Sequence, residues 1–342
     1  MTVLAGIGVD IGGTHTEVVA VTAEFSVVAR VKDRTLHADV STLRTGTAHL
    51  VREVLNLAAS SCRFTEPVPV GVGILGFVDP ESGTVHGAAN LPALHNPVCM
   101  GRELADELGL PVVIENDVRA GALEACVLAE RKLGHPVKDV VYLSIGTGVA
   151  AVIVIGGVVL RGALGIAGDI GHAPLPGATE RCNCGLTGCL ETRIAGPALS
   201  RRWGTGDEET SATALFLAAE DGDARATTIV TELTRDVREL VHWLFHATGT
   251  QAVVLGGGVC TAHPDFPEWI GRDLANLAAR SQGASNWAQP QRLISAPIGH
   301  PTGALGAARL ACGRALTPFA ASSTDGRRPQ PPRPTDPVAP TT

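Results

Sequence analysis

Three glycine turns, each following a run of aliphatic residues, constrain the fold of this chain more than any other feature. They read DIGGTH at 10–15, SIGTGV at 144–149 and LGGGVC at 255–260. A glycine at the end of a strand lets backbone amides approach a phosphate with no Cβ in the way, and a threonine hydroxyl adds a donor. None of the three turns fits the P-loop pattern or the GxGxxG pattern. The turns therefore predict phosphate contacts at the ends of three strands.

The segments between these turns alternate between strand and helix patterns, which is typical of an α/β protein. Strands are predicted at 4–10, 14–23, 25–33, 68–74, 111–116, 139–148, 150–157 and 252–258. Helices are predicted at 41–60, opening at Ser41, at 101–108, from a cap at Asp117 to about Arg131, at 223–247 and after His300. The proline-rich, polar segment 318–342 is predicted to be disordered.

Composition narrows the class of protein further. The chain has 342 residues, enough for two domains, and 45% of them are hydrophobic. Its net charge is −7 and the predicted folded region holds no cluster of lysine or arginine, which argues against nucleic acid or an anionic membrane as partner. There is no basic, apolar leader at the N-terminus and no apolar run of roughly 20 residues. We therefore expect a cytoplasmic protein with reduced cysteines.

One short stretch, GHAPLPGATERCNCGLTGCLE at 171–191, contains one histidine and three cysteines. Together with the preceding residues, its runs GDIGH and CNCGLTGCLE resemble the signature of the ROK family of bacterial sugar kinases and sugar-responsive repressors. The runs END at 115–117, GFVDP at 76–80 and ANLP at 89–92 match that family in order and approximate spacing. The resemblance covers roughly residues 3–313.

The resemblance implies a two-lobed actin/hexokinase-like ATPase fold with ribonuclease H-like lobes. The three glycine turns would be its phosphate-1, phosphate-2 and adenosine elements. The expected small lobe spans about 1–116 and is completed by a helix at 303–315, and the expected large lobe spans 117–302. Homodimers are usual in the family, so a homodimer is expected here.

A structural zinc site is also implied, with His172, Cys182, Cys184 and Cys189 as its ligands. Three thiolates and one imidazole make a closed tetrahedral site with no position for water, which is a structural arrangement rather than a catalytic one. Such a site stabilises a loop with little hydrophobic content of its own. The alternative is a reactive cysteine cluster.

The resemblance also implies an ATP- and Mg²⁺-dependent sugar kinase with Asp117 as the base that accepts the proton of the attacking hydroxyl. The sugar would be bound by Asn90, Asn116, Asp117, Asp169, His172 and Glu191. Asp10 would hold Mg²⁺, and the β- and γ-phosphates and the adenosine would lie against Gly12, Gly13, Thr14, Gly146, Thr147, Gly148, Gly257 and Gly258.

Some positions depart from the family pattern. His15 replaces the usual lysine after DIGGT, and Asp169 replaces a glutamate. The shorter Asp169 side chain retracts its carboxylate by about 1.5 Å, enough to lose a hydrogen bond.

The motifs favour a glucokinase-type kinase that phosphorylates the primary hydroxyl of a hexose. The alternatives are a C7-cyclitol kinase for an acceptor of valienone or valiolone type, an amino-sugar kinase, or a sugar sensor without catalytic activity. A repressor would need an N-terminal helix-turn-helix domain, and the first predicted strand already begins at residue 4.

Overall fold

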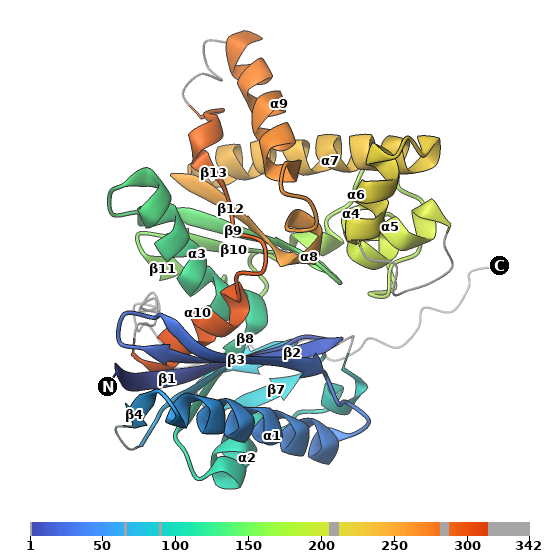
Figure 1. The fold of residues 1–342 in the computed structure, drawn as a ribbon. Coiled ribbons are helices and arrows are strands. Elements are labelled where there is room, and N and C mark those ends of the chain that lie inside the picture. The colour runs from blue at the N-terminus through green and yellow to red at the C-terminus, as the bar shows by residue number, and fades with distance from the viewer. Residues whose placement is uncertain (1, 65–66, 89–90, 205–211, 281–286, 314–342) are drawn as a thin grey trace, which may run out of the picture.

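The protein is described here by a computed structural model that covers residues 2–64, 67–88, 91–204, 212–280 and 287–313. It has two lobes, each built on a mixed β-sheet with helices on both faces (Figure 1). The predicted terminal segment 318–342 lies outside the described residues. Among those residues, no helix combines the length and the apolar character that a membrane span requires.

The first sheet has the strand order β3-β2-β1-β5-β8, with β4 beside β1. β1 pairs antiparallel with β2 and parallel with β4 and β5, and β5 pairs parallel with β8. Helices α1 and α2 pack on one face, and a short hairpin, β6 and β7, lies next to β8. The bounds are β1 Thr2–Ile11, β2 His15–Thr22, β3 Val27–Arg34, α1 Val40–Ala59, β4 Cys62–Phe64, β5 Val70–Ile74, β6 Phe77–Asp79, β7 Thr84–His86, η1 Pro92–Leu94, α2 Met100–Leu108 and β8 Val112–Asn116.

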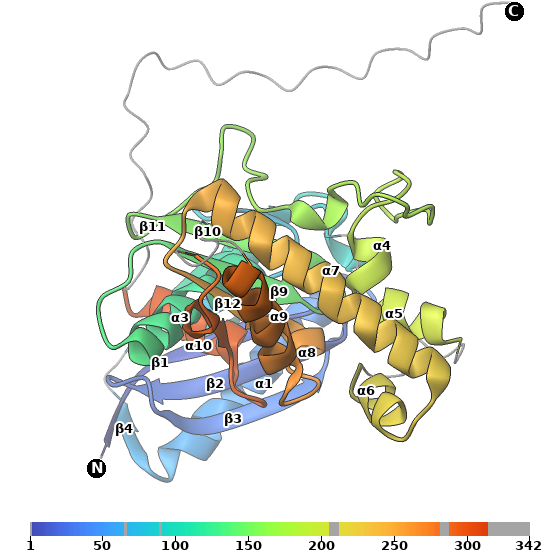
Figure 2. The same cartoon turned by 90° about the horizontal axis from the view of Figure 1, so that it is seen from above.

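The second sheet repeats this plan with the order β11-β10-β9-β12-β13. An antiparallel pair, β9 and β10, is again followed by parallel strands, β12 and β13. Figure 2 shows the long helix α7 crossing this sheet. The bounds are α3 Asp117–Leu133, β9 Val140–Ile145, β10 Val149–Ile155, β11 Val158–Val159, η2 Ile170–His172, α4 Glu191–Ile194, α5 Gly196–Trp203, α6 Ala212–Glu220, α7 Ala224–Thr248, β12 Ala252–Gly256, α8 Gly257–Cys260, α9 Phe266–Arg280, η4 Pro290–Arg292, β13 Leu293–Ser295 and α10 Thr302–Ala311.

Helix α10 lies between the two sheets and packs against β1, β5 and α3 (Figure 1). Glycines make this close approach possible. A Cβ at Gly8 would lie 1.8 Å from the carbonyl oxygen of Ala304, and one at Gly71 would lie 1.8 Å from that of Ala307. The last described helix is thereby held directly on the first strands of the chain.

The predicted strands and helices are present, but two predicted helix starts are wrong. Asn116 rather than Asp117 caps α3, because its backbone is not helical and its side chain accepts a hydrogen bond from the backbone N–H of Arg119. Asp117 is the first helical residue. Likewise α1 begins at Val40 and is capped by Asp39, not opened by Ser41.

Candidate active site

A cavity of about 840 Å³ is lined by residues from both lobes. It brings together most of the residues that the sequence singled out, although they come from segments far apart in the chain. Gly257 and Cys189 do not line it, and Asn90 lies outside the described residues. The predicted residues that line the cavity are Asp10, Gly12, Gly13, Thr14, Asn116, Asp117, Gly146, Thr147, Gly148, Asp169, His172, Cys182, Cys184, Glu191 and Gly258.

Asp10 stands near the end of β1, with its carboxylate against the first turn of α10. A Cβ at Gly303 would lie 2.1 Å from the Asp10 Oδ2 atom, so only glycine leaves room for the carboxylate there. Burial raises the pKa of Asp10 from its ordinary 3.8 to about 8, and the negative charges of Asp117 and Glu17 add to the shift. A divalent cation would offset both effects, so the environment of this carboxylate fits the predicted magnesium contact.

The turn between β9 and β10 is held by a side chain that the sequence assigned to the sugar. The backbone N–H of Gly146 donates to the carbonyl of Gly148 over 2.9 Å, which closes the turn. Glu191 Oε2 accepts a hydrogen bond of 3.1 Å from the backbone N–H of Val149 and occupies the space that a Cβ at Gly148 would need. Glu191 therefore connects the predicted acceptor residues to the predicted phosphate turn.

The two glycines after β12 have different roles. Gly257 has a φ of +82°, and a Cβ there would lie 2.4 Å from the carbonyl oxygen of Ile145, so the fold itself requires glycine. Gly258 has no such constraint, and a Cβ there would meet no protein atom within 4 Å. Because Gly258 also lines the cavity, its missing side chain leaves space for a ligand.

Asn116 and Asp117 lie at the junction of β8 and α3. The Asn116 Nδ2 atom donates to Asp117 Oδ1 over 2.9 Å and to the carbonyl of Gly76 over 3.2 Å. Burial raises the pKa of Asp117 from 3.8 to about 6, an effect that hydrogen bonds from backbone N–H groups partly oppose. A carboxyl group with a pKa near neutrality, oriented by a neighbour, has the properties of a general base.

His172 faces two groups through its two ring nitrogens. Its Nδ1 atom lies 3.6 Å from the Cys182 sulfur, and its Nε2 atom lies 3.9 Å from Asp169 Oδ1. Among the described residues, none donates a hydrogen bond to the Asp169 carboxylate, which lines the cavity and is partly exposed. The Asp169 carboxylate is thus available to a bound molecule.

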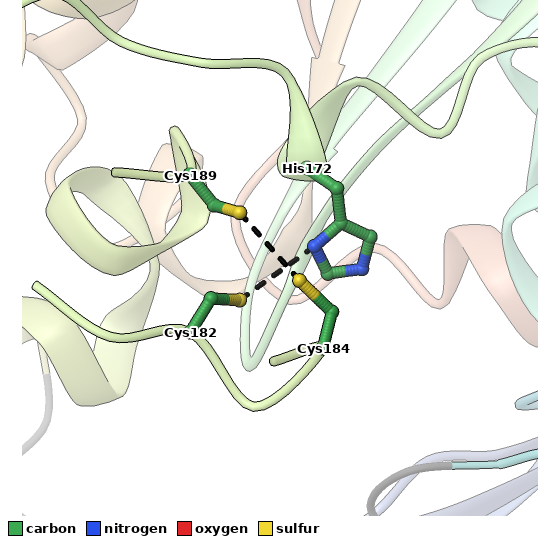
Figure 3. Close-up of side chains that lie close together, drawn as sticks. All are labelled: His172, Cys182, Cys184 and Cys189. Carbon is green, nitrogen blue, oxygen red and sulfur yellow. Dashed lines mark hydrogen bonds between the residues drawn. The ribbon is translucent and has the colours of Figure 1, made fainter. Parts of the chain in front are cut away.

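The histidine and the three cysteines converge on one point (Figure 3). Their ligand atoms all lie within 4.8 Å of one another, and the Cys184 and Cys189 sulfurs are 3.6 Å apart. A zinc ion about 2.3 Å from each sulfur would set the sulfurs roughly 3.8 Å apart, so the residues fit a tetrahedral metal. Burial, followed by the neighbouring thiols, raises the pKa of Cys189 to about 12, which a bound cation would reverse.

The cavity is also lined by residues that sequence reasoning missed, among them Phe77, Arg119 and Arg201. Phe77 belongs to the GFVDP run and stacks on His86 with ring centroids 5.5 Å apart. Arg119 follows Asp117 by two residues, and its Nη1 atom lies 4.0 Å from Oε1 of Glu115 at the end of β8. For Arg201 no signal existed, because α5 was not predicted and only the fold brings it to the cavity.

Comparison with known proteins agrees with this geometry. Residues 6–314 match the ROK family. The chain is 31% identical over 272 residues to a glucokinase of Thermotoga maritima, with 75% of this chain and 82% of that protein covered. It is similar to the ROK hexokinase structure of Thermus thermophilus (30% identity, TM-score 0.67, 92% and 99% of the two chains covered). A ROK family glucokinase of Streptomyces griseus, solved with glucose and AMPPNP, is 27% identical with a TM-score of 0.69 over 90% and 99% of the two chains.

Proposed function

The chain belongs to the ROK family, and from this premise we propose that it is an ATP-dependent kinase for the primary hydroxyl of a hexose, of the glucokinase type. The observation that carries the proposal is the position of Asp117. Its carboxylate has a raised pKa and lines the same cavity as the glycine turns of both lobes. The glucokinase relatives support the same activity.

In the proposed reaction the acceptor oxygen attacks the γ-phosphorus of ATP, the bond to the β-phosphate oxygen breaks, and ADP leaves. Asp117 accepts the proton of the attacking hydroxyl, while Asn116 orients the Asp117 carboxylate through its amide. Backbone amides of Gly13, Thr14, Thr147 and Gly148 would hold the phosphates, while those of Gly12 and Gly146 close the two turns. Mg²⁺, bound near Asp10, would neutralise phosphate charge, which is its usual contribution to phosphoryl transfer.

We assign the cluster of His172, Cys182, Cys184 and Cys189 to a structural zinc ion. Zinc would fix the loop that follows η2, and with it the cavity-facing ring of His172. His172 can then contribute to both the zinc site and the acceptor site, because its Nδ1 atom faces the cysteines and its Nε2 atom faces Asp169. Asn90 is retained in the proposed acceptor site on the family resemblance alone.

We expect residue Asp169 to decide which acceptor the site prefers. In a glucokinase-type site its carboxylate would bind hydroxyls at the anomeric end of the hexose, and the shorter side chain weakens that contact. The alternative acceptor is a C7-cyclitol of valienone or valiolone type, which differs from glucose at that end and keeps a primary hydroxyl. An amino sugar is a further candidate.

A coupled kinase assay with ATP tests the proposal across glucose, N-acetylmannosamine, fructose and valienone-type cyclitols. We expect turnover with glucose in the wild type and a kcat that is roughly 10²-fold lower, or lower still, in Asp117→Asn. A wild type that turns over no member of the panel contradicts the kinase assignment. Asp169→Glu should raise kcat/KM for glucose if residue 169 sets specificity. If the wild type prefers the cyclitol and Asp169→Glu shifts that preference to glucose, the cyclitol alternative is correct.

A further inference from the structure

Three charged side chains connect the loop before η2 to the segment that carries Asp117. Glu115 is the next-to-last residue of β8, Arg119 lies in the first turn of α3, and Arg161 follows β11. We call Glu115, Arg119 and Arg161 the loop clamp. Residues 161–168 are called the acceptor loop, which begins at the clamp residue Arg161. Glu115 and Arg161 belong to different lobes, since β8 is part of the first sheet and β11 is part of the second.

Direct contacts hold the clamp together. The guanidinium of Arg161 binds both carboxylate oxygens of Glu115, with Nη1 3.4 Å from Oε1 and Nη2 on Oε2. Arg119 donates from Nη2 to the carbonyl of Gly165 over 2.6 Å, and its Nη1 atom lies 4.0 Å from Glu115 Oε1. A planar guanidinium with two bonds to one carboxylate fixes direction as well as distance.

Backbone hydrogen bonds within the acceptor loop hold it together, so the clamp positions residues 161–168 as one unit. The backbone N–H of Ala167 donates to the carbonyl of Arg161 over 3.2 Å, and the N–H of Gly165 donates to that of Gly162 over 3.2 Å. At the far end Gly168 lies against β10, where its carbonyl accepts from the Ala151 N–H over 2.8 Å. Asp169 comes next, and its backbone N–H donates to the carbonyl of Ile166 over 3.0 Å, so its backbone is held by the acceptor loop and by the neighbouring contact with β10.

Glu115 acts on the other side of the cavity as well. Its Oε1 atom accepts a hydrogen bond of 2.9 Å from the backbone N–H of Asn116, the residue that orients Asp117. The Glu115 carboxylate therefore contacts both Arg161, at the start of the acceptor loop, and the backbone N–H of Asn116, the residue next to the proposed base Asp117. Glu115 is buried, which strengthens these interactions relative to a surface ion pair.

We propose that Glu115, Arg119 and Arg161 are positioning residues that set the distance between Asp169 and Asp117 and thereby the affinity for the acceptor. This inference rests on the proposed kinase function. A clamp with a merely structural role would lower thermal stability alone. A positioning clamp changes KM for the acceptor and leaves KM for ATP unchanged, because the phosphate turns make none of these contacts.

The test compares Arg161→Gln and Glu115→Gln with a control, Arg44→Gln. Arg44 forms an ion pair with Glu103 at 3.2 Å, is exposed to a similar degree (28% against 35%), and lies away from the cavity. We expect KM for glucose to rise roughly 10- to 100-fold in the clamp variants, as expected for a small misplacement of an acceptor. Arg161→Lys should give an intermediate value, because lysine restores the charge without the planar fork.

Hydrogen–deuterium exchange of segment 161–169 gives a second readout that needs no substrate. We expect faster exchange in this segment for Arg161→Gln and no change for Arg44→Gln. Unchanged exchange, or an unchanged KM for glucose in both clamp variants, overturns the proposal, as does an equal rise in KM for ATP. If Arg161→Gln does not fold, Glu115→Gln decides, because its amide oxygen still accepts from Asn116. Lack of turnover in the wild type would contradict the kinase function instead, and the exchange comparison would still decide on the clamp.

Discussion

Replacing Asp117 by asparagine should have opposite effects on activity and on stability. Asparagine keeps the shape of the side chain and an oxygen for the Asn116 amide, which donates to Asp117 Oδ1 over 2.9 Å. The cap of α3 is untouched, because Asn116 supplies it. What is lost is the ability to accept a proton, so kcat should fall roughly 10²-fold or more, the usual contribution of a general base.

The stability effect follows from the pKa of Asp117. Burial raises it from 3.8 to about 6, so the folded state binds the proton more tightly than the unfolded state. Stability is therefore lost as the pH rises from about 4 to about 6, and the loss persists above that. A shift of about 2 pKa units corresponds to roughly 3 kcal/mol. Asp117→Asn should raise the free energy of unfolding by up to that amount at pH 8, and by less at pH 5.

The assay pairs steady-state kinetics with thermal unfolding at pH 8 and pH 5. The control is Asp106→Asn, a carboxylate on α2 whose side chain is 76% exposed, which should alter neither quantity. For the wild type, kcat/KM should rise with pH through about 6, because the base must be ionised. Near-normal turnover in Asp117→Asn removes Asp117 from the mechanism. A variant no more stable than wild type at pH 8 refutes the argument from burial.

Elemental analysis should find one zinc per chain, and Cys184→Ser should lower zinc content and melting temperature together; less than about a tenth of an equivalent in active protein contradicts this. Because the pKa of Asp10 is raised to about 8, Mg²⁺ must displace a proton there, so the apparent Mg²⁺ affinity should increase between pH 6 and 8; a pH-independent affinity in a titration of initial rates would argue against the contact. Gly8→Ala forces a Cβ to within 1.8 Å of the Ala304 carbonyl and should cost at least about 1–3 kcal/mol in denaturant unfolding. Gly258→Ala, with no protein atom within 4 Å, should retain stability and raise KM for ATP; an unchanged KM would show that no ligand approaches there.

Local patterns were enough to predict eight strands, the helices α1, α2, α3, α7 and α10, and most of the residues that line the cavity, but not helix α9 or the short strands β4, β6, β7, β11 and β13. The glycine turns at 10–15 and 144–149 follow buried strands, as their aliphatic runs indicated. The spacing of the three cysteines and His172 brought four ligand atoms within 4.8 Å of one another. These features depend on neighbours in the sequence, which is why a single sequence reveals them.

Local patterns did not identify the residue that caps α3, because two neighbouring residues are both suitable caps. Asn116 and Asp117 are both good helix caps, and the sequence could not choose between them. The choice depends on backbone torsion angles that the pairing of β8 with β5 sets. The hydrogen bond between Glu191 and the Val149 amide was not predictable either, because it depends on how the loop after η2 returns to β10.

The sequence by itself determined where eight of the strands lie, which turns carry glycine and which residues can bind a metal, since these properties depend on residue type and short spacing. Only the tertiary structure decided that α10 lies on β1, where Gly8 meets Ala304 across nearly the whole chain. It alone also brought Arg161 to Glu115, 46 residues away, and so joined the acceptor loop to the segment of Asp117. The physical reason is that such contacts form when sheets and helices pack, and one sequence contains no local signal of which distant partner each charge or glycine will meet.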